Sequence, residues 1–385
     1  MNCIYCGGVF DNGSSEHVIL SALGGKKQTK SICCEKCNNR LNTEIDNDFA
    51  KQLSVIANQI NLITGRKKSP ATLKNIDTEK GYKIELRPGC QPELARASVD
   101  ANTHNNGEIH ISISARNQEE AKTLLEGQLK KFGKNLNDIK IQKCERVSEH
   151  VGTLHFNLSI GGPLHFRSIA KMMLNYFASK FNPDRMTISS FQKAIQFIDK
   201  GVPLPENWIN FDYINRFPSS TTLSPFNHRL LIGTRSKEKI VYGFLELFGE
   251  LNFSAILDDQ WDGPDKNYVY IVDPATSVQK EEEIVFNISK VMLMKKECSL
   301  SEVQNAFNRL FEKIKKKIEK EFSENLIQET IEKHVKGKSE IITPEMINAS
   351  SQELAQALVK AMCKIDTREE FDILNLFDNE KDKMA

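Results

Sequence analysis

Apolar residues recur at near-helical spacing between residues 49 and 62 and predict a helix there, formed around Phe49, Leu53, Ile56, Ile60 and Leu62. Before this helix we expect a short strand through residues 17–20, a Gly24-Gly25 turn, and a helix that starts at residue 34. The segment from Gly65 to Pro70 ends the helical pattern. We therefore expect a domain boundary near residue 75.

From about residue 76 to 290 apolar and polar positions alternate in short runs, which is typical of half-buried strands. The expected strands span residues 82–86, 109–113, 154–160, 229–233, 240–248, 253–257 and 268–272. The expected helices span residues 118–132, 166–181 and 188–200. The pattern predicts an α+β domain of unknown role without fixing the order of its strands.

From about residue 299 the chain becomes helical and highly charged. One apolar stripe runs along it, and Lys and Glu cover the other face. The stripe comprises Val303, Phe307, Leu310, Phe311, Ile314, Ile318 and Phe322. Because its spacing is not a strict heptad, we expect the helix to pack on its own domain rather than in a dimerising coiled coil. The chain thus divides into residues 1–75, an α+β domain over 76–290, and a helical region over 291–385.

Charge is unevenly distributed, although the whole chain carries a formal net charge of +1. Residues 1–75 hold ten Lys or Arg against six Asp or Glu, a net charge of +4, so the remainder carries −3. A polyanion would therefore approach the N-terminal end. Candidate contacts to a phosphate backbone are Lys26, Lys27, Lys30, Arg40, Arg66, Lys67 and Lys68. Solvated loop charge is the alternative explanation for the two basic runs.

Five of the nine cysteines fall within the first 37 residues, and four of these form two Cys-x2-Cys pairs, Cys3 with Cys6 and Cys34 with Cys37. Two such turns supply four thiolates, a ligand set that tetrahedral zinc prefers. Structural zinc contributes about 10–16 kcal/mol of apparent binding free energy, which a short segment with few large apolar residues needs. Cys33 lacks the two-residue spacing, so we expect it to be a buried spare.

Cysteines used as metal ligands favour a reducing compartment over a secreted disulfide framework. No stretch reaches the roughly 18 consecutive apolar residues of a membrane span, and a leader peptide would have to contain Cys3 and Cys6. We therefore expect a cytoplasmic protein without a membrane partner.

Three polar residues near the cysteine pairs can carry phosphodiester chemistry, namely Glu16, His17 and Asn38. Cleaving a phosphodiester needs a base that deprotonates water and a cation that neutralises the phosphate. His17 has the chemistry of the base, and the other two offer the hard oxygen ligands that magnesium accepts. Glu16 and His17 are neighbours on a strand, so we expect their side chains to point to opposite faces unless the strand is bent or bulged. Asn38 is expected to begin a helix, where free amides favour a phosphate.

The N-terminal segment resembles the cysteine-bearing branch of the HNH nuclease superfamily. The resemblance rests on a cysteine pair, the Glu16-His17 and Gly24-Gly25 dipeptides, the second cysteine pair and the Asn38 that follows it, in this order along the chain. The branch is similar to nucleases of the endonuclease VII type. The resemblance covers about residues 1–50 and implies a zinc-bound, treble-clef-like ββα-metal domain that hydrolyses DNA. It further implies that His17 activates water, that Glu16 and Asn38 bind one catalytic Mg2+ or Mn2+ ion, and that the four cysteines bind structural Zn2+.

Two departures from the family pattern concern the catalytic hairpin. Many members have Asp where this chain has Glu16, which lengthens the reach to the ion by one methylene group. Many members also carry a hairpin Asn that orients the histidine, and no Asn lies between Leu23 and Cys33. Gln28 and Thr29 are the candidates to replace it.

Two other interpretations compete with a constitutive nuclease. One is a non-catalytic zinc-stabilised module that binds nucleic acid or protein, although all three candidate catalytic side chains are present. The other makes residues 76–385 the sensor of a regulated effector of prokaryotic phage defence or of a mobile element. A small-molecule or protein activator would then contact His165, Arg167, Lys171 or the 258–261 loop, for which ordinary packing is the alternative. By family analogy alone, cleavage of two strands by one-metal sites leads us to expect a homodimer.

Overall fold

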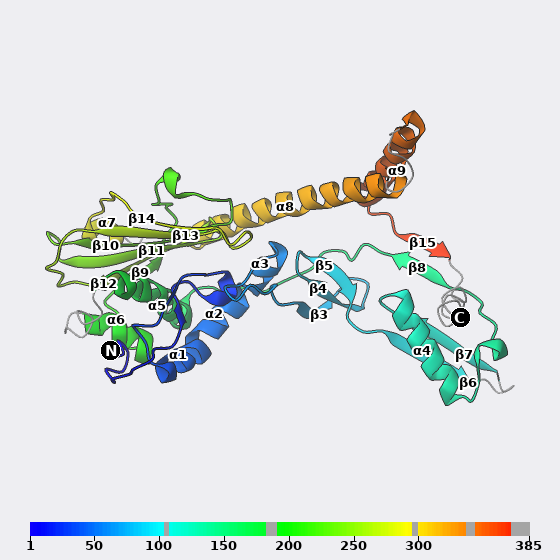
Figure 1. Ribbon diagram of the computed structural model, residues 1–385, viewed down its shortest axis with the longest axis horizontal. Coiled ribbons are helices and arrows are strands. Elements are labelled where there is room, and N and C mark those ends of the chain that lie inside the picture. Colours follow the sequence, from blue (N-terminus) through cyan, green and yellow to red (C-terminus); the bar gives the residue numbers. More distant parts are fainter. Residues whose placement is uncertain (104–107, 182–190, 295–298, 336–342, 371–385) are drawn as a thin grey trace. The chain divides into compact units, whose positions relative to one another are not determined.

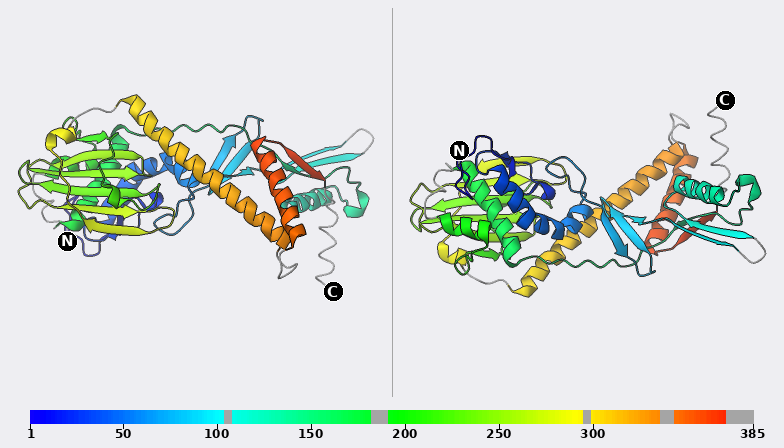
Figure 2. Two further views of the ribbon diagram at one scale, coloured as in Figure 1. Left: turned by 90° about the horizontal axis from the view of Figure 1, so that it is seen from above. Right: turned by 90° about the horizontal axis from the view of Figure 1, so that it is seen from below.

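The computed structural model describes residues 1–103, 108–181, 191–294, 299–335 and 343–370, and its contacts divide the chain into two compact units. The first unit comprises Met1–Ala71, Pro88–Cys90 and Phe156–Ile318, and the second comprises Thr72–Arg87, Gln91–His155 and Glu319–Ala385. Figure 1 labels the elements, and Figure 2 shows two further views in the same colours along the chain. Each unit therefore combines segments that lie far apart in the sequence.

The N-terminal segment of the first unit is a small hairpin followed by a nearly continuous helical run. Antiparallel strands β1 (Glu16–His17) and β2 (Gln28–Thr29) flank the 3-10 turn η1 (Ser21–Leu23). The helical run consists of α1 (Glu35–Leu41), a π-helical turn η2 (Asn42–Asp46), α2 (Asn47–Gln52) and α3 (Ser54–Gln59). The order ββα is the one expected. The strand is shorter than expected, and the two expected helices, one from residue 34 and one over 49–62, form one run because buried residues recur through Leu41, Ile45 and Phe49.

A six-stranded antiparallel sheet forms the centre of the first unit, in the order β14-β13-β10-β11-β12-β9. Its strands are β9 (Ile209–Phe211), β10 (His228–Arg235), β11 (Ile240–Leu247), β12 (Leu251–Asp258), β13 (Asn267–Val272) and β14 (Gln279–Glu283). Every residue of β10, β11 and β12 is buried. This degree of burial requires that both faces of the sheet are covered.

Helices α5 (Gly162–Lys180) and α6 (Gln192–Lys200) cover one face of the sheet, and α5 also packs against η2 and α2 of the N-terminal segment (Figure 1). Gly243 of β11 permits the close approach of α5, because a Cβ there would lie 2.8 Å from the Met173 sulfur. One apolar core extends from the N-terminal segment through α5 to the sheet. Residues 1–71 and 156–318 therefore fold as one body.

The opposite face of the sheet carries a second apolar cluster that includes Trp208, Phe217, Phe244, Ile256 and Leu293. The covering residues come from the segment before β10 and from the segment that contains α7 (Lys290–Met294). The first half of the long helix α8 (Leu300–Val335) also packs on the first unit, where Ala306, Leu310 and Ile314 are buried. The expected packing of this helix on its own domain is thus observed up to residue 318, whereas Phe322 is 48% exposed.

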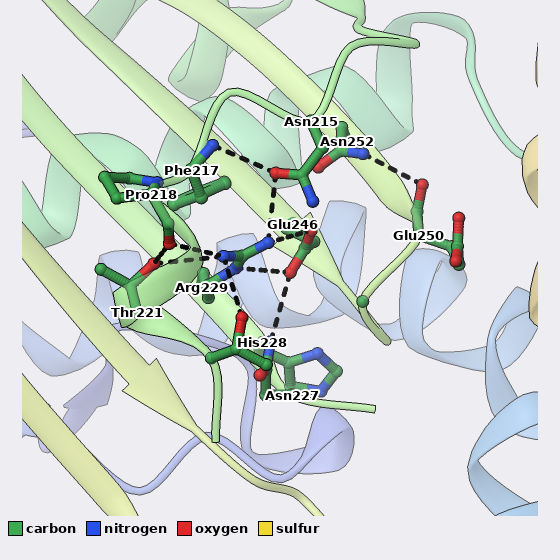
Figure 3. A network of polar contacts seen from close by, with 12 residues as sticks. Asn215, Phe217, Pro218, Thr221, Asn227, His228, Arg229, Glu246, Glu250 and Asn252 are labelled. Atoms are coloured by element: carbon green, nitrogen blue, oxygen red, sulfur yellow. Dashed lines mark hydrogen bonds and ion pairs between the residues drawn. The ribbon is translucent and has the colours of Figure 1, made fainter. Parts of the chain in front are cut away.

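A buried ion pair fastens the loop before β10 to the sheet (Figure 3). Arg229 and Glu246 face each other across β10 and β11, and the guanidinium donates from Nε and Nη2 to the two carboxylate oxygens, both at 2.7 Å. The same guanidinium lies 4.5 Å from the Phe217 ring centroid and donates to Thr221 Oγ1 at 3.1 Å. Because the two charges pair with each other and are hydrogen-bonded, burying this network leaves no unpaired charge in the interior.

The second unit consists of small antiparallel sheets and helices. A three-stranded sheet is formed by β3 (Leu73–Asp77), β4 (Lys83–Arg87) and β5 (Gln91–Leu94). Two further pairs join β6 (Ser98–Thr103) with β7 (Ile109–Ser114) and β8 (Glu145–Ser148) with β15 (Thr367–Glu370). Its helical elements are α4 (Gln118–Lys131), the 3-10 turn η3 (Leu136–Asp138), the end of α8, and α9 (Pro344–Met362). Within the described ranges, no helix is both long and apolar enough to cross a membrane.

Two sequence expectations differ from the structure. Residues 154–160 alternate in exposure but form no strand, and the Ser159 amide donates to a side chain, Gln52 Oε1, at 3.0 Å. The divisions expected near residues 75 and 290 also differ from the observed units, because the apolar core joins residues 1–71 to the 156–318 segment. Of the helix expected over 188–200, residues 188–190 lie outside the described ranges, and α6 begins at Gln192.

Candidate functional site

Four cysteines meet at the start of α1 and form a candidate zinc centre. The sulfur atoms of Cys3, Cys6, Cys34 and Cys37 all lie within 4.8 Å of one another. The Cys6 and Cys34 sulfurs are 3.9 Å apart. With Zn–S bonds of about 2.3 Å, sulfurs at the corners of a tetrahedron are about 3.8 Å apart. The four thiols therefore fit one structural zinc ion, as the sequence predicted.

Cys33 is fully buried beside this cluster, as expected of a residue outside the ligand set. The Cys33 thiol donates to the Cys34 carbonyl at 3.3 Å, and its proximity to Cys3 is the largest cause that lowers the pKa of Cys3, to about 4. A thiolate is a better metal ligand than a protonated thiol. Cys33 is thus a buried neighbour of Cys3 that lies outside the four-cysteine cluster.

His17 lies on β1 with both ring nitrogens engaged. Nδ1 lies 3.0 Å from the Gly25 carbonyl oxygen, which can only accept, so Nδ1 carries the proton. Nε2 then has the lone pair and accepts from the Gln28 amide nitrogen at 2.9 Å. The amide oxygen of Gln28 accepts from the Ser15 hydroxyl, which fixes the amide orientation. Gln28, one of the two candidates for the missing hairpin Asn, therefore does contact the histidine.

The environment of His17 keeps the imidazole neutral. Burial is the largest cause that lowers the pKa of His17 below its usual value, and the positive charges of Arg66, Lys171 and Lys26 lower it further. The hydrogen bond to Gly25 opposes this shift in part. A neutral imidazole with Nε2 unprotonated has the form that a general base needs at pH 7.

A basic turn over residues 64–68 lies directly on the His17 ring. The Gly65 amide donates to the Ser21 carbonyl at 2.8 Å, and the Lys26 ammonium donates to the Thr64 carbonyl at 2.6 Å. A Cβ on Gly65 would lie 2.2 Å from the Gly25 oxygen and 2.8 Å from His17 Cε1. Glycine is therefore required here, and the turn brings the exposed side chains of residues 66–68 to the rim of the site.

Glu16 points away from His17, as the pleat of a strand requires. Its carboxylate is 4% exposed and forms an ion pair with the Lys171 ammonium of α5. Asn175 Nδ2 donates to the same Oε1 atom at 3.0 Å. Burial raises the pKa of Glu16, and the charge of Lys171 offsets part of that rise. The structure thus places the carboxylate in the interior.

Asn38 lies one turn inside α1 rather than at its first residue. The helix starts at Glu35, so the Asn38 amide already donates to the Cys34 carbonyl at 3.0 Å. Its side-chain Nδ2 donates to the Ser14 hydroxyl at 2.7 Å. The free backbone amide expected at residue 38 is therefore absent, and the side-chain amide is held against the chain before β1.

The donors that the resemblance assigns to a catalytic divalent ion do not fit that task as they are arranged. Glu16 Oε1 already receives two donors, one of them a cation. Asn38 contacts Ser14 on a different segment. In the described part of the chain, the cysteine cluster is the group of His, Cys, Asp and Glu side chains that is close enough to hold a metal.

The seven basic candidates for nucleic-acid contact fall into two groups. Lys27 pairs with Glu281 at 3.0 Å, and Arg40 pairs with Asp199 and with Glu44. These two side chains thus link the N-terminal segment to the rest of the first unit. The remaining candidates are Lys26, which is half-buried against the 64–68 turn, and the exposed residues Lys30, Arg66, Lys67 and Lys68.

The residues of α5 that were candidate activator contacts serve as links inside the first unit. His165 Nε2 lies 2.9 Å from an Asp48 carboxylate oxygen, and Arg167 donates to the Ile198 carbonyl at 3.0 Å and 2.9 Å. Lys171 is 1% exposed. Trp261 of the 258–261 loop packs edge-on against Phe177 and Phe181. The role of Lys171 was missed by the sequence reasoning, although a lysine within the apolar run 169–178 is a signal of a buried ion pair.

Comparison with known families supports this reading of the N-terminal segment. Residues 3–54 match the family model described as HNH endonuclease. The matched range contains the four-cysteine cluster, the β1–β2 hairpin and α1. No curated protein and no solved structure matches the chain.

Proposed function

We propose that this protein is an HNH endonuclease that hydrolyses phosphodiester bonds in DNA, with His17 as the general base. The observation that carries the proposal is the state of the imidazole. The Gly25 carbonyl holds the proton on Nδ1 and leaves the lone pair on Nε2, where the exposed Gln28 amide donates to it, and Gly65 of the basic turn lies against the ring. The family match over residues 3–54 supports the same assignment.

In the proposed reaction, His17 Nε2 takes a proton from a water molecule as its oxygen attacks phosphorus. One bridging P–O bond breaks, and the leaving oxygen takes a proton from solvent. The Gln28 amide, which donates to Nε2 at rest, must give way to that water. Lys26 and Arg66 are close enough to His17 to lower its pKa, and Lys67 is close enough to Lys26 to lower the pKa of that lysine. These cations neutralise the phosphate charge.

The resemblance also implies that DNA cleavage depends on Mg2+ or Mn2+, and we propose this dependence for experimental test. Because Glu16 and Asn38 are engaged elsewhere, we derive no step through such an ion. Cleavage assays with added Mg2+, with added Mn2+ and with EDTA on the zinc-loaded protein measure the dependence directly.

The test is cleavage of a panel of plasmid, linear, junction and single-stranded DNA by the full chain. His17→Ala should lose about 10² to 10⁴ in rate and stay folded. His155→Ala is the matched control, since this histidine is exposed in a segment without regular structure, and it should cut at the wild-type rate. Equal cutting by His17→Ala and the wild type would remove His17 from the mechanism.

DNA binding through the basic turn has its own readout. Arg66→Ala and Lys67→Ala should each weaken binding and reduce the slope of log K against log salt by about 1. Lys237→Ala, in the exposed turn between β10 and β11, is the control. Binding without cleavage by the wild type on every substrate would favour the alternative, a non-catalytic zinc-stabilised nucleic-acid-binding module.

The wider role, a regulated effector of phage defence or of a mobile element, is proposed from the resemblance alone. In that role a ligand or protein partner of the region after residue 75 releases the nuclease activity. Full cutting by the purified chain, unchanged by a panel of small-molecule activators, would contradict the regulated form of the proposal.

A further inference from the structure

The buried surroundings of Glu16 form a closed polar cluster that joins the hairpin, η2 and α5. The Lys171 ammonium pairs with the Glu16 carboxylate and donates to Asp46 Oδ2 at 2.6 Å. The Ser168 hydroxyl donates to Asp46 Oδ1 at 2.6 Å. Asn175 bridges to the zinc-binding segment by accepting from the Tyr5 hydroxyl at 2.6 Å. All of these groups are less than 7% exposed.

The balance of charge makes this cluster dependent on Lys171. It contains two carboxylates and one ammonium, so loss of the lysine would leave two like charges buried together. A buried carboxylate without a partner carries a large desolvation cost. The lysine lies 155 residues after Glu16 in the sequence, so the N-terminal segment obtains this counter-charge only when α5 is docked on it.

The same geometry argues against a divalent ion on Glu16. Oε1 accepts from Lys171 Nζ and from Asn175 Nδ2, which uses both lone pairs of that atom and leaves only Oε2 to an ion. An added divalent cation on this carboxylate would lie close to the ammonium, and two cations in a buried site repel strongly. On the other side of the strand, His17 directs its ring toward Gly25 and Gln28.

We propose that Glu16 is an anchor and not a ligand of a catalytic ion, and that Lys171 of α5 is the positioning residue that holds β1 so that His17 faces the substrate. This inference rests on the proposed nuclease function and deepens it, because it makes α5 part of the nuclease site. Strand β1 consists of Glu16 and His17 alone, so fixing the first side chain in the interior fixes the direction of the second.

The first test separates an anchor from a metal ligand. Zinc-loaded wild type and Glu16→Gln, both as full chains, are titrated with Mn2+ by calorimetry, and cleavage is measured as a function of Mn2+ concentration. The glutamine keeps the hydrogen bonds, so half-saturation in Mn2+ should agree with the wild type within about twofold. Half-saturation weakened by about 10- to 100-fold, the loss typical of a damaged metal site, with an unchanged melting temperature, would overturn the inference.

The second test addresses Lys171. Lys171→Met should lower the melting temperature by roughly 6–20 °C and reduce kcat while KM for DNA stays the same. The triple variant Lys171→Met, Glu16→Gln, Asp46→Asn removes all three charges and should recover most of the melting temperature and part of kcat. Lys193→Met on α6, an exposed lysine paired with Asp259, is the matched control and should behave as the wild type.

The inference would be overturned if Lys171→Met had the same melting temperature as the wild type. It would also be overturned if the triple variant folded but were as inactive as His17→Ala. Failure of the nuclease proposal is distinguishable from failure of the anchor. If the wild type cuts no DNA, the proposed function is wrong, while the melting temperatures of the single and triple variants still decide whether Lys171 compensates Glu16 and Asp46.

Discussion

At the scale of single residues, His17 is set up by backbone geometry more than by other catalytic side chains. A carbonyl oxygen on Nδ1 fixes the tautomer, and the neighbouring strand residue Gln28 holds Nε2 until substrate arrives. Both contacts follow from a hairpin in which β1 and β2 pair at two positions only. The tautomer of the base is therefore fixed by local structure within the hairpin, whereas the direction of the ring also depends on contacts from Gly65 and α5.

The lowered pKa of His17 predicts the acid limb of the pH profile. Protonated imidazole cannot accept a proton, so kcat/KM falls as the pH drops through the pKa of His17 and is level above it. Because burial, Arg66, Lys171 and Lys26 all lower this pKa, the midpoint should lie below pH 6.5. Arg66→Ala removes one positive charge and should move the midpoint upward, whereas Lys237→Ala should not. A wild-type midpoint at or above pH 6.5 would contradict this description of the site.

Gly65 offers a second residue-scale prediction. Alanine at this position places a Cβ against the Gly25 oxygen and His17 Cε1, so the 64–68 turn or the imidazole must move. We expect Gly65→Ala to lower kcat by at least about tenfold, since displacing a catalytic group by 1 Å can cost about 100-fold. Gly127→Ala in α4 has open space around the new methyl group and serves as the control, with unchanged cleavage. Wild-type kcat in Gly65→Ala would show that the turn does not constrain the ring.

Those features of the site that depend only on residues close together in the sequence could be predicted from the sequence. The cysteine pairs and the opposite faces of Glu16 and His17 are set within a few residues of one another, so both expectations hold. The partner of Glu16 could not be predicted, because Lys171 becomes its neighbour only through the packing of α5. For the same reason, the contact of Gly65 with His17 has no signature in the sequence.

At the scale of elements, zinc should control the structure of the first 41 residues. The knuckle before β1 contributes Cys3 and Cys6, and the cysteines at the start of α1 complete the set. Removing the ion with a strong chelator, or replacing Cys37 with Ser, should lower the melting temperature and abolish cleavage together. Metal analysis should give one zinc per chain in the wild type. Full stability without bound metal would contradict a structural role for the cluster.

The central sheet shows why alternation of apolar residues is an incomplete guide to strands. The expected strands at 229–233, 240–248, 253–257 and 268–272 correspond to β10, β11, β12 and β13. These strands are largely buried on both faces, and two of their charged residues, Arg229 and Glu246, are buried as an ion pair. The edge strand β14 reads Gln-Lys-Glu-Glu-Glu and has no apolar pattern, so backbone pairing with β13 alone defines it.

At the scale of the whole molecule, the N-terminal segment depends on the 156–318 segment for much of its support. The His228 imidazole donates from Nε2 to the Leu23 carbonyl at 2.7 Å, and burial lowers the pKa of His228 to about 4, so the ring is neutral at pH 7. The Tyr270 hydroxyl accepts from the amides of Lys26 and Lys27 at 3.3 Å and 3.0 Å. The sequence alone indicated a separable domain, because these contacts link positions more than 200 residues apart.

This dependence predicts the behaviour of a fragment limited to residues 1–75. The fragment keeps the four zinc ligands, so it should still bind zinc. It loses Lys171 beside two acids and exposes the side chains that α5 and the sheet cover, including Ile19, Leu23 and Ile45. We expect poorly dispersed amide resonances and no cleavage from the fragment, and recovery of both when residues 156–318 are co-expressed with it. A fragment that folds alone and cuts DNA at the rate of the full chain would show that the hairpin needs no support from α5, because every element that positions His17 would then lie within the first 75 residues.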